Sequence, residues 1–222
     1  RPFVLEAPAR LLQRFAQAVG TGLAWLLLVA SLARPQWLGE PLELPVSGRD
    51  LMLAIDISGS MESEDMSVNG RAVSRLSAVK AIAGDFIERR EGDRLGLILF
   101  GDQAYLQTPL TFDRETVRTQ LNEAAIGLAG KRTAIGDAIG LAVKRLRDQP
   151  QENRVLVLLT DGDNTAGQVA PLKAAQLARR EQVRIYTIGM GADELPVQTL
   201  FGVQRVANTQ LDERTLKAIA DA

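Results

Sequence analysis

The 222-residue sequence contains neither cysteine nor histidine. Without cysteine, the chain has no disulfide framework and no thiolate metal site. Without histidine, it cannot contain a Ser-His-Asp triad, a histidine general base or an HExxH zinc site. The side chains left for binding a hard metal ion are those with oxygen atoms.

The chain also lacks an excess of charge of either sign. It contains 26 Lys and Arg residues and 27 Asp and Glu residues, which gives a net charge of −1. A nucleic-acid-binding domain would show a strongly basic face, so no nucleic-acid partner is expected. Apolar residues make up 46% of the chain, which is enough for a sizeable core. The length suits one domain with an appendage, and a first residue that is Arg1 rather than methionine indicates a fragment or a processed chain.

One long stretch without charge, 15–33, lies near the N-terminus. As a helix it would span roughly 28 Å, about the thickness of a bilayer core, so we predict a transmembrane helix. A buried core helix is the alternative, because Gln17 and Gly20 weaken the first half. Arginines in 1–14 place that segment in the cytoplasm by the positive-inside rule, with the large domain outside. Residues 34–49, which include three prolines, are expected to form an extended linker.

From residue 50 onward, strand-like and helix-like segments alternate. The strand-like runs are 51–58, 94–101, 154–161 and 184–191, with a short edge strand at 104–108. The helix-like segments are 74–90, 113–124, 134–148, 170–182 and 212–221. This alternation predicts an α/β fold, with helices on both faces of a doubly wound, mostly parallel sheet.

Two of the strand-like runs end in an aspartate. The first ends at Asp56, with Ser58 and Ser60 two and four positions later, and another ends at Asp161-Gly162. Ligands of open α/β sheets bind at the carboxyl ends of the strands, where neighbouring strands would bring both carboxylates together. Carboxylates and hydroxyls are oxygen ligands suited to Mg²⁺ or a similar ion. For Asp161 alone, a turn or N-cap role is the alternative.

A third hydroxyl candidate lies just before the predicted helix 134–148. Thr133 is placed to cap this helix, which alone would explain a threonine there. Its hydroxyl would nevertheless face the same cleft at the top of the sheet. Asp137 lies in the first turn, where complementing the helix N-terminus is the alternative to a role in the site.

These residues resemble the metal-ion-dependent adhesion site (MIDAS) of von Willebrand factor A (VWA) domains, over about residues 50–222. The resemblance implies a six-stranded sheet of order 3-2-1-4-5-6. It also implies a Mg²⁺ or Mn²⁺ site in which two carboxylates and three hydroxyls leave one position for an acidic side chain from a protein partner. The implied metal ligands are Asp56, Ser58, Ser60, Thr133 and Asp161.

More closely, the chain resembles the Bat-type aerotolerance membrane proteins. The resemblance rests on Leu32-Ala33-Arg34-Pro35-Gln36, Gly92-Asp93-Arg94-Leu95-Gly96-Leu97 and Val183-Arg184-Ile185-Tyr186-Thr187-Ile188-Gly189. Those proteins carry a periplasmic VWA domain between membrane helices and are encoded beside MoxR-type AAA+ ATPases. The resemblance implies a bacterial inner-membrane protein with its VWA domain in the periplasm. Its implied partners are a MoxR-type ATPase and sister VWA proteins.

Enzymatic interpretations find less support in the residues. A haloacid-dehalogenase-type phosphatase would carry Asp-x-Asp where this chain has Asp56-x-Ser58. No P-loop, complete nucleophile elbow or complete EF-hand loop occurs. We therefore predict a binding module that is not an enzyme. The alternatives are a VWA subunit of a soluble AAA+ complex such as a metal chelatase, a VWA fold with an empty site, and a metal-dependent hydrolase.

Overall fold

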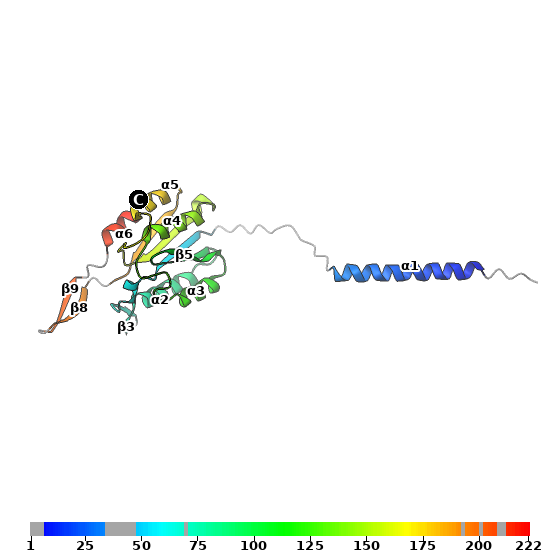
Figure 1. The fold of residues 1–222 in the computed structure, drawn as a ribbon, viewed down its shortest axis with the longest axis horizontal. Coiled ribbons are helices and arrows are strands. Elements are labelled where there is room, and N and C mark those ends of the chain that lie inside the picture. The colour runs from blue at the N-terminus through cyan, green and yellow to red at the C-terminus, as the bar shows by residue number, and fades with distance from the viewer. Residues whose placement is uncertain (1–6, 34–47, 69–70, 192–193, 200–201, 208–211) are drawn as a thin grey trace, which may run out of the picture. The chain divides into compact units, whose positions relative to one another are not determined.

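The structure, a computed structural model, describes the chain outside six segments (Figure 1). These segments are residues 1–6, 34–47, 69–70, 192–193, 200–201 and 208–211. The described chain divides into two compact units, Arg1–Leu44 and Pro45–Ala222. Most of the predicted linker, 34–49, and the first part of the predicted cytoplasmic segment, 1–14, lie outside the described residues.

The N-terminal unit contains one long helix, α1 (Ala7–Leu32), drawn in blue in Figure 1. Its residues Leu12–Leu32 are long and apolar enough to cross a membrane, judged by length and composition, and they are not buried. Leu26, for example, is 70% exposed. The hydroxyl of Thr21 donates to the carbonyl oxygen of Gln17 at 2.8 Å, which satisfies a polar group within the apolar stretch. The helix thus has the dimensions of a membrane span, and the crossing itself stays a prediction.

The second unit is built on a five-stranded sheet of order β5-β4-β1-β6-β7. Four of these strands run parallel, and β5 joins β4 in the antiparallel direction. The strands are β1 (Asp50–Asp56), β4 (Arg94–Phe100), β5 (Ala104–Thr111), β6 (Arg154–Thr160) and β7 (Arg184–Gly189). This arrangement confirms the predicted doubly wound, mostly parallel α/β sheet.

The structure corrects the expected six strands to five for the described residues. The five strands occupy the first five places of the order 3-2-1-4-5-6. After β7 the chain folds back on itself as a separate antiparallel pair, β8 (Glu194–Thr199) and β9 (Gly202–Ala207), which satisfies its backbone hydrogen bonds locally. A second small pair, β2 (Met66–Val68) and β3 (Arg71–Val73), lies along the chain between Ser60 and helix α2 (Arg75–Glu88).

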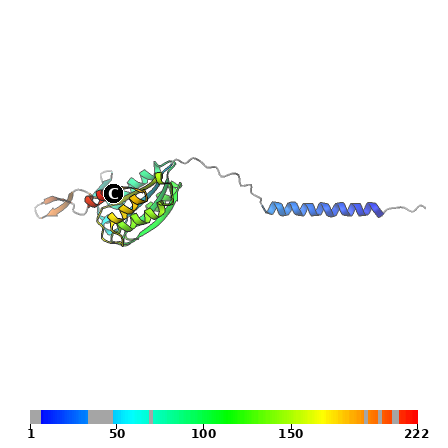
Figure 2. The same ribbon diagram turned by 90° about the horizontal axis from the view of Figure 1, so that it is seen from above.

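Helices cover both faces of the sheet, and the alternation of side chains along β1 explains how. Leu51, Leu53 and Ile55 join one buried cluster with α2 and α3, whereas Met52 and Ala54 join another with α4, α5 and α6. Figure 2 looks from above onto α4 and α5. The helices and 3-10 turns are α2 (Arg75–Glu88), α3 (Arg114–Glu123), α4 (Ile135–Leu146), α5 (Pro171–Arg180), α6 (Glu213–Ala220), η1 (Gly59–Glu62) and η2 (Gln151–Asn153). β1 is therefore buried on both faces, which is why its apolar run is continuous.

Candidate metal-binding site at the carboxyl edge of the sheet

Asp56 ends β1 with a fully buried carboxylate that is hydrogen-bonded on both oxygens. Its Oδ1 accepts the N–H of Ser58 at 2.9 Å, and its Oδ2 accepts the hydroxyl of Thr160 at 2.6 Å. The pKa of Asp56 is raised to about 6. Burial is the largest cause, and the nearby charge of Asp161 also raises this pKa, whereas the hydrogen bonds from Ser58 and Thr160 act in the opposite direction. The structure thus brings Asp56 close to Asp161, and it adds Thr160, which sequence reasoning did not single out.

Ser58 and Ser60 lie on the turn that follows β1 and begins η1. Ser58 is buried, Ser60 is half-buried, and their hydroxyl oxygens lie 3.0 Å apart. Between them, the N–H of Gly59 donates to the carbonyl oxygen of Lys131 at 2.9 Å. The two hydroxyls are therefore held next to each other and against the loop that carries Thr133.

Thr133 lies buried in the loop between α3 and α4. Its N–H donates to the hydroxyl oxygen of Thr165 at 2.9 Å, and the N–H of Ala134 donates to the carbonyl oxygen of Gly101 at 2.8 Å. A glycine is needed at 101, directly after β4, because a Cβ there would lie 2.7 Å from the carbonyl oxygen of Ala129. The loop is thereby fixed between the end of β4 and the loop that follows β6.

The helix-cap alternative for Thr133 is wrong. The N-cap position of α4 is Ala134, which makes no side-chain cap hydrogen bond. The first N–H of the helix, that of Ile135, instead donates to Oδ1 of Asn164 at 2.9 Å. The loop after β6 therefore supplies this cap, and the Thr133 hydroxyl is left for another role.

Asp161 directly follows β6 and is only 1% exposed. Its Oδ2 accepts a hydrogen bond from Nη1 of Arg75 at 3.1 Å. Its Oδ1 is buried and has no hydrogen-bond partner in the described part of the chain. A turn or N-cap aspartate would accept a nearby backbone N–H, so neither local role accounts for this carboxylate. A buried carboxylate oxygen without a donor is a suitable position for a cation.

Two other acidic residues near this edge do not join the group. Asp137 lies in the first turn of α4, as predicted, and its Oδ1 accepts the N–H groups of Gln168 and Val169, each at 3.0 Å. It therefore holds the segment that follows Asp161. Asp163 is exposed to solvent.

Arg75, the first residue of α2, is the neighbour of the site that sequence reasoning missed. Its fully buried side chain lies between Asp65 and Asp161. Burial lowers the pKa of its guanidinium, but the hydrogen bond and charge of Asp65 and the charge of Asp161 raise it by more. A signal was present, because Arg75 lies four residues before Val79 in the buried stripe of α2 that continues to Ala83. A charged residue in such a stripe requires a partner.

The predicted ligands form a set that is rich in hydroxyls and poor in carboxylates. Across the described ranges, no three Asp, Glu, His or Cys side chains cluster as a metal site. An ion here would therefore depend on two buried carboxylates and on hydroxyl oxygens, a chemistry that suits Mg²⁺ and other hard divalent ions. The partnerless Oδ1 of Asp161 fits such an ion. The donor residues are Asp56, Ser58, Ser60, Thr133 and Asp161.

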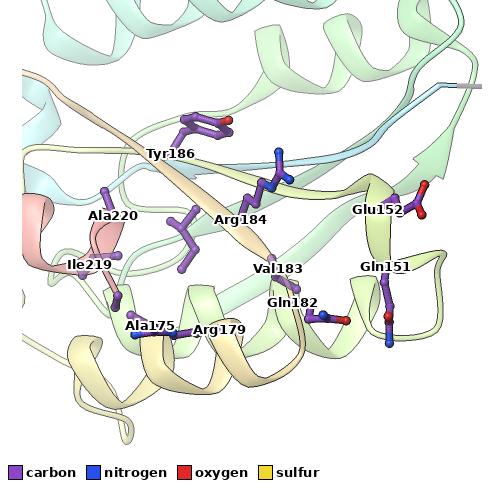
Figure 3. A pocket seen from close by; sticks show the side chains of 12 residues that line it. Gln151, Glu152, Ala175, Arg179, Gln182, Val183, Arg184, Tyr186, Ile219 and Ala220 are labelled. Carbon is purple, nitrogen blue, oxygen red and sulfur yellow. The ribbon is translucent and has the colours of Figure 1, made fainter.

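A cavity of about 700 Å³ lies elsewhere in this unit, along β7. Figure 3 shows side chains of α5, β7 and α6 that line it, among them Arg179, Tyr186 and Ile219. None of the five predicted ligands lines this cavity. The cavity and the candidate metal site are therefore separate features.

Comparison with known sequences agrees with the fold. The sequence model of the von Willebrand factor type A domain matches residues 50–221. A protein of Borreliella burgdorferi is 31% identical over 172 residues, which cover 78% of this chain and 49% of that protein. The chain thus spans about half the length of this relative.

Solved structures agree as well. An aerotolerance-related membrane protein from Bacteroides fragilis is 29% identical with a TM-score of 0.64, and the match covers 78% of this chain and 87% of that one. Proximal thread matrix protein 1 from the mussel byssus, in a structure with a zinc-occupied MIDAS motif, is 27% identical with a TM-score of 0.52, over 65% of this chain and 36% of that one. These matches confirm the predicted resemblance to VWA domains and to aerotolerance-related membrane proteins. The chain belongs to the von Willebrand factor type A domain family.

Proposed function

We propose that this chain is a membrane-anchored VWA domain that binds a protein partner through a divalent-metal site. The observation that carries the proposal is the buried Oδ1 of Asp161, which has no hydrogen-bond partner in the described part of the chain and lies at the same sheet edge as the buried Asp56. The proposed ligands are Asp56, Ser58, Ser60, Thr133 and Asp161.

The ligand set favours a binding contact over catalysis. Two carboxylates roughly neutralise a divalent ion, whereas neutral hydroxyls leave it attractive to a further anionic oxygen. A bound Mg²⁺ or Mn²⁺ would supply that attraction, and an acidic side chain of the partner would take the remaining position. The zinc-occupied motif of the mussel protein supports a divalent ion at this place in the fold. The lack of histidine excludes catalysis by a histidine general base in this chain.

The proposed location is a bacterial inner membrane, with α1 as the anchor, residues 1–14 in the cytoplasm and the VWA domain in the periplasm. The exposed apolar side chains of α1 support the anchor, and the arginines that precede its uncharged part support the orientation. The similar B. fragilis protein is described as a membrane protein. A subunit of a soluble AAA+ complex such as a metal chelatase would not need this helix.

The proposed wider assembly contains a MoxR-type AAA+ ATPase and sister VWA proteins, in a stress-tolerance role. Its support is the similarity to an aerotolerance-related protein. In the proposed orientation, the ATPase would meet the protein on the cytoplasmic side, through the 1–14 segment or through parts of the protein outside this sequence.

Metal binding by the full chain in detergent tests the site. Calorimetric titration with Mg²⁺ and Mn²⁺ should show binding by the wild type and none by Asp56→Ala. Asp163→Ala is a matched control, because Asp163 is exposed and lies only two positions from Asp161. Absence of binding by the wild type, or equal binding by Asp56→Ala, would show that the proposed site is wrong.

The metal-dependent contact is tested by affinity capture from bacterial membranes with the tagged full chain. A partner retained in Mg²⁺, released by EDTA and not retained by Asp56→Ala is the expected result. A partner retained equally in EDTA would contradict a contact made through the metal.

A further inference from the structure

The starting observation is a buried ion pair at the candidate metal site. Nη1 of Arg75 lies 3.1 Å from Oδ2 of Asp161, and the two side chains are 0% and 1% exposed. Arg75 comes from the start of α2 and Asp161 from the end of β6, so the pair joins two separate elements of the sheet edge. The hydrogen bond engages one carboxylate oxygen and leaves the other, Oδ1, without a partner in the described ranges.

The guanidinium of Arg75 is itself held from its other side. Its Nε donates to Oδ1 of Asp65 at 2.9 Å, and its Nη2 donates to Oδ2 of Asp65 at 2.6 Å. The Asp65 side chain is only 4% exposed, and Asp65 follows the turn that carries Ser58 and Ser60. The two-point contact fixes the plane of the guanidinium as well as its position.

A cation next to a proposed cation site needs a reason, because its charge alone would repel the metal. Asp65 offsets that charge, since its carboxylate is nearer to the guanidinium than that of Asp161. The remaining effect of Arg75 is geometric. Asp65 fixes the plane of the guanidinium, and the guanidinium orients the Asp161 carboxylate through its hydrogen bond to Oδ2. Partners of this kind outside the ligand shell commonly set the orientation of metal-binding side chains.

We infer that Arg75 is a positioning residue for metal binding, which fixes Asp161 through Oδ2 so that Oδ1 stays available to the ion, while Asp65 fixes Arg75. The inference rests on the proposed function, because it concerns the same metal site. It adds two residues, Arg75 and Asp65, that are not themselves ligands.

The affinity of the full chain for Mn²⁺ in detergent, measured by calorimetry, tests the inference. Arg75→Met keeps the length of the side chain and removes the donors, and it should weaken Mn²⁺ binding about tenfold or more. Asp65→Asn should weaken it in the same direction, because Arg75 loses its charged anchor. Arg75→Lys should keep part of the Mn²⁺ affinity that is lost in Arg75→Met. If Arg75 acted through charge alone, Arg75→Met would bind Mn²⁺ more tightly than the wild type.

Arg94→Met is the matched control. Arg94 pairs with the buried Asp50 at 2.7 Å, at the opposite, amino end of β1 and β4, although the Arg94 side chain is 32% exposed and that of Arg75 is fully buried. This variant should lose stability, measured by thermal unfolding, and keep the wild-type Mn²⁺ affinity. Equal loss of Mn²⁺ affinity in Arg94→Met and Arg75→Met would overturn the inference, because general loosening of the fold would then explain both.

The remaining outcomes separate this inference from the proposed function. A wild type that does not bind Mn²⁺ overturns both. A wild type that binds, together with unchanged or tighter binding by Arg75→Met, overturns only the positioning role. If Arg75→Met does not fold by circular dichroism, Asp65→Asn decides: weaker binding supports the inference, and unchanged binding overturns it.

Discussion

Replacing Asp56 with asparagine should stabilise the metal-free protein at neutral pH, although it removes a proposed ligand. The Asp56 carboxylate is fully buried, and in the folded metal-free chain its pKa is raised from 3.8 to about 6. The folded state therefore holds the proton more tightly than the unfolded state. The resulting contribution to stability is fully present below pH 3.8 and is lost as the pH rises through about 6.

The size of this loss follows from the shift. A pKa difference of about 2 units corresponds to about 3 kcal/mol between the protonated and ionised states. Asparagine cannot ionise, so it avoids the loss. Its amide oxygen can still accept the N–H of Ser58, and its NH₂ group can face the hydroxyl oxygen of Thr160, where Asp56 is now bonded. At about pH 8, Asp56→Asn should therefore be more stable than the wild type by up to about 3 kcal/mol.

Urea unfolding of both proteins in EDTA, followed by circular dichroism between about pH 5 and pH 8, measures this difference. The advantage of Asp56→Asn should shrink as the pH falls. Saturating Mg²⁺ should stabilise only the wild type, by about 2.7 kcal/mol at a hundredfold excess over Kd. The reasoning is refuted if Asp56→Asn is the less stable protein in EDTA at pH 8, or if its advantage does not depend on pH.

Three further predictions concern the site, the core and the helix. Asp161→Ala should abolish Mn²⁺ binding and, by leaving a buried guanidinium without this partner, lower stability by about 3–5 kcal/mol. Asp163→Ala, at an exposed position, should change stability by less than about 0.5 kcal/mol. Equal effects of Asp161→Ala and Asp163→Ala in urea unfolding and in calorimetry would refute the assignment of Asp161 as a metal ligand. Leu158→Ala and Ile55→Ala, at fully buried positions of adjacent central strands, should each cost about 2–5 kcal/mol in urea unfolding, and a much smaller loss would contradict their central placement. The full chain expressed in bacteria should remain with the membrane pellet after alkaline carbonate washing, and release into the supernatant would refute the anchor.

The elements that could be predicted from sequence are those whose signal is local. β1 and β6 contain continuous apolar runs; Asp56 is the last residue of β1 and Asp161 directly follows β6, so both the central strands and the candidate carboxylates could be found by pattern alone. The strand count was too high because it came from the family resemblance, whereas the residues after β7 pair with each other.

The features that sequence reasoning missed depend on contacts between distant segments. Thr133 satisfies the local rule for a helix cap, but Asn164, 29 residues from Ile135, supplies the cap instead. Arg75 and Asp161 are separated by 86 residues, and no periodicity relates them. Such pairs are fixed by tertiary packing, which a one-dimensional pattern does not contain.

The central position of β1 also determines how the domain would carry mechanical load. A partner bound at the carboxyl edge would pull at Asp56, whereas the N-terminal continuation of the chain leaves from the opposite end of the same strand, at Asp50. β1 is paired in parallel with β4 on one side and with β6 on the other. Force along β1 would therefore act in shear on evenly spaced hydrogen bonds of both ladders at once, and would not open them one after another. A chain that enters the domain through this central strand would therefore resist pulling through two hydrogen-bonded ladders at once.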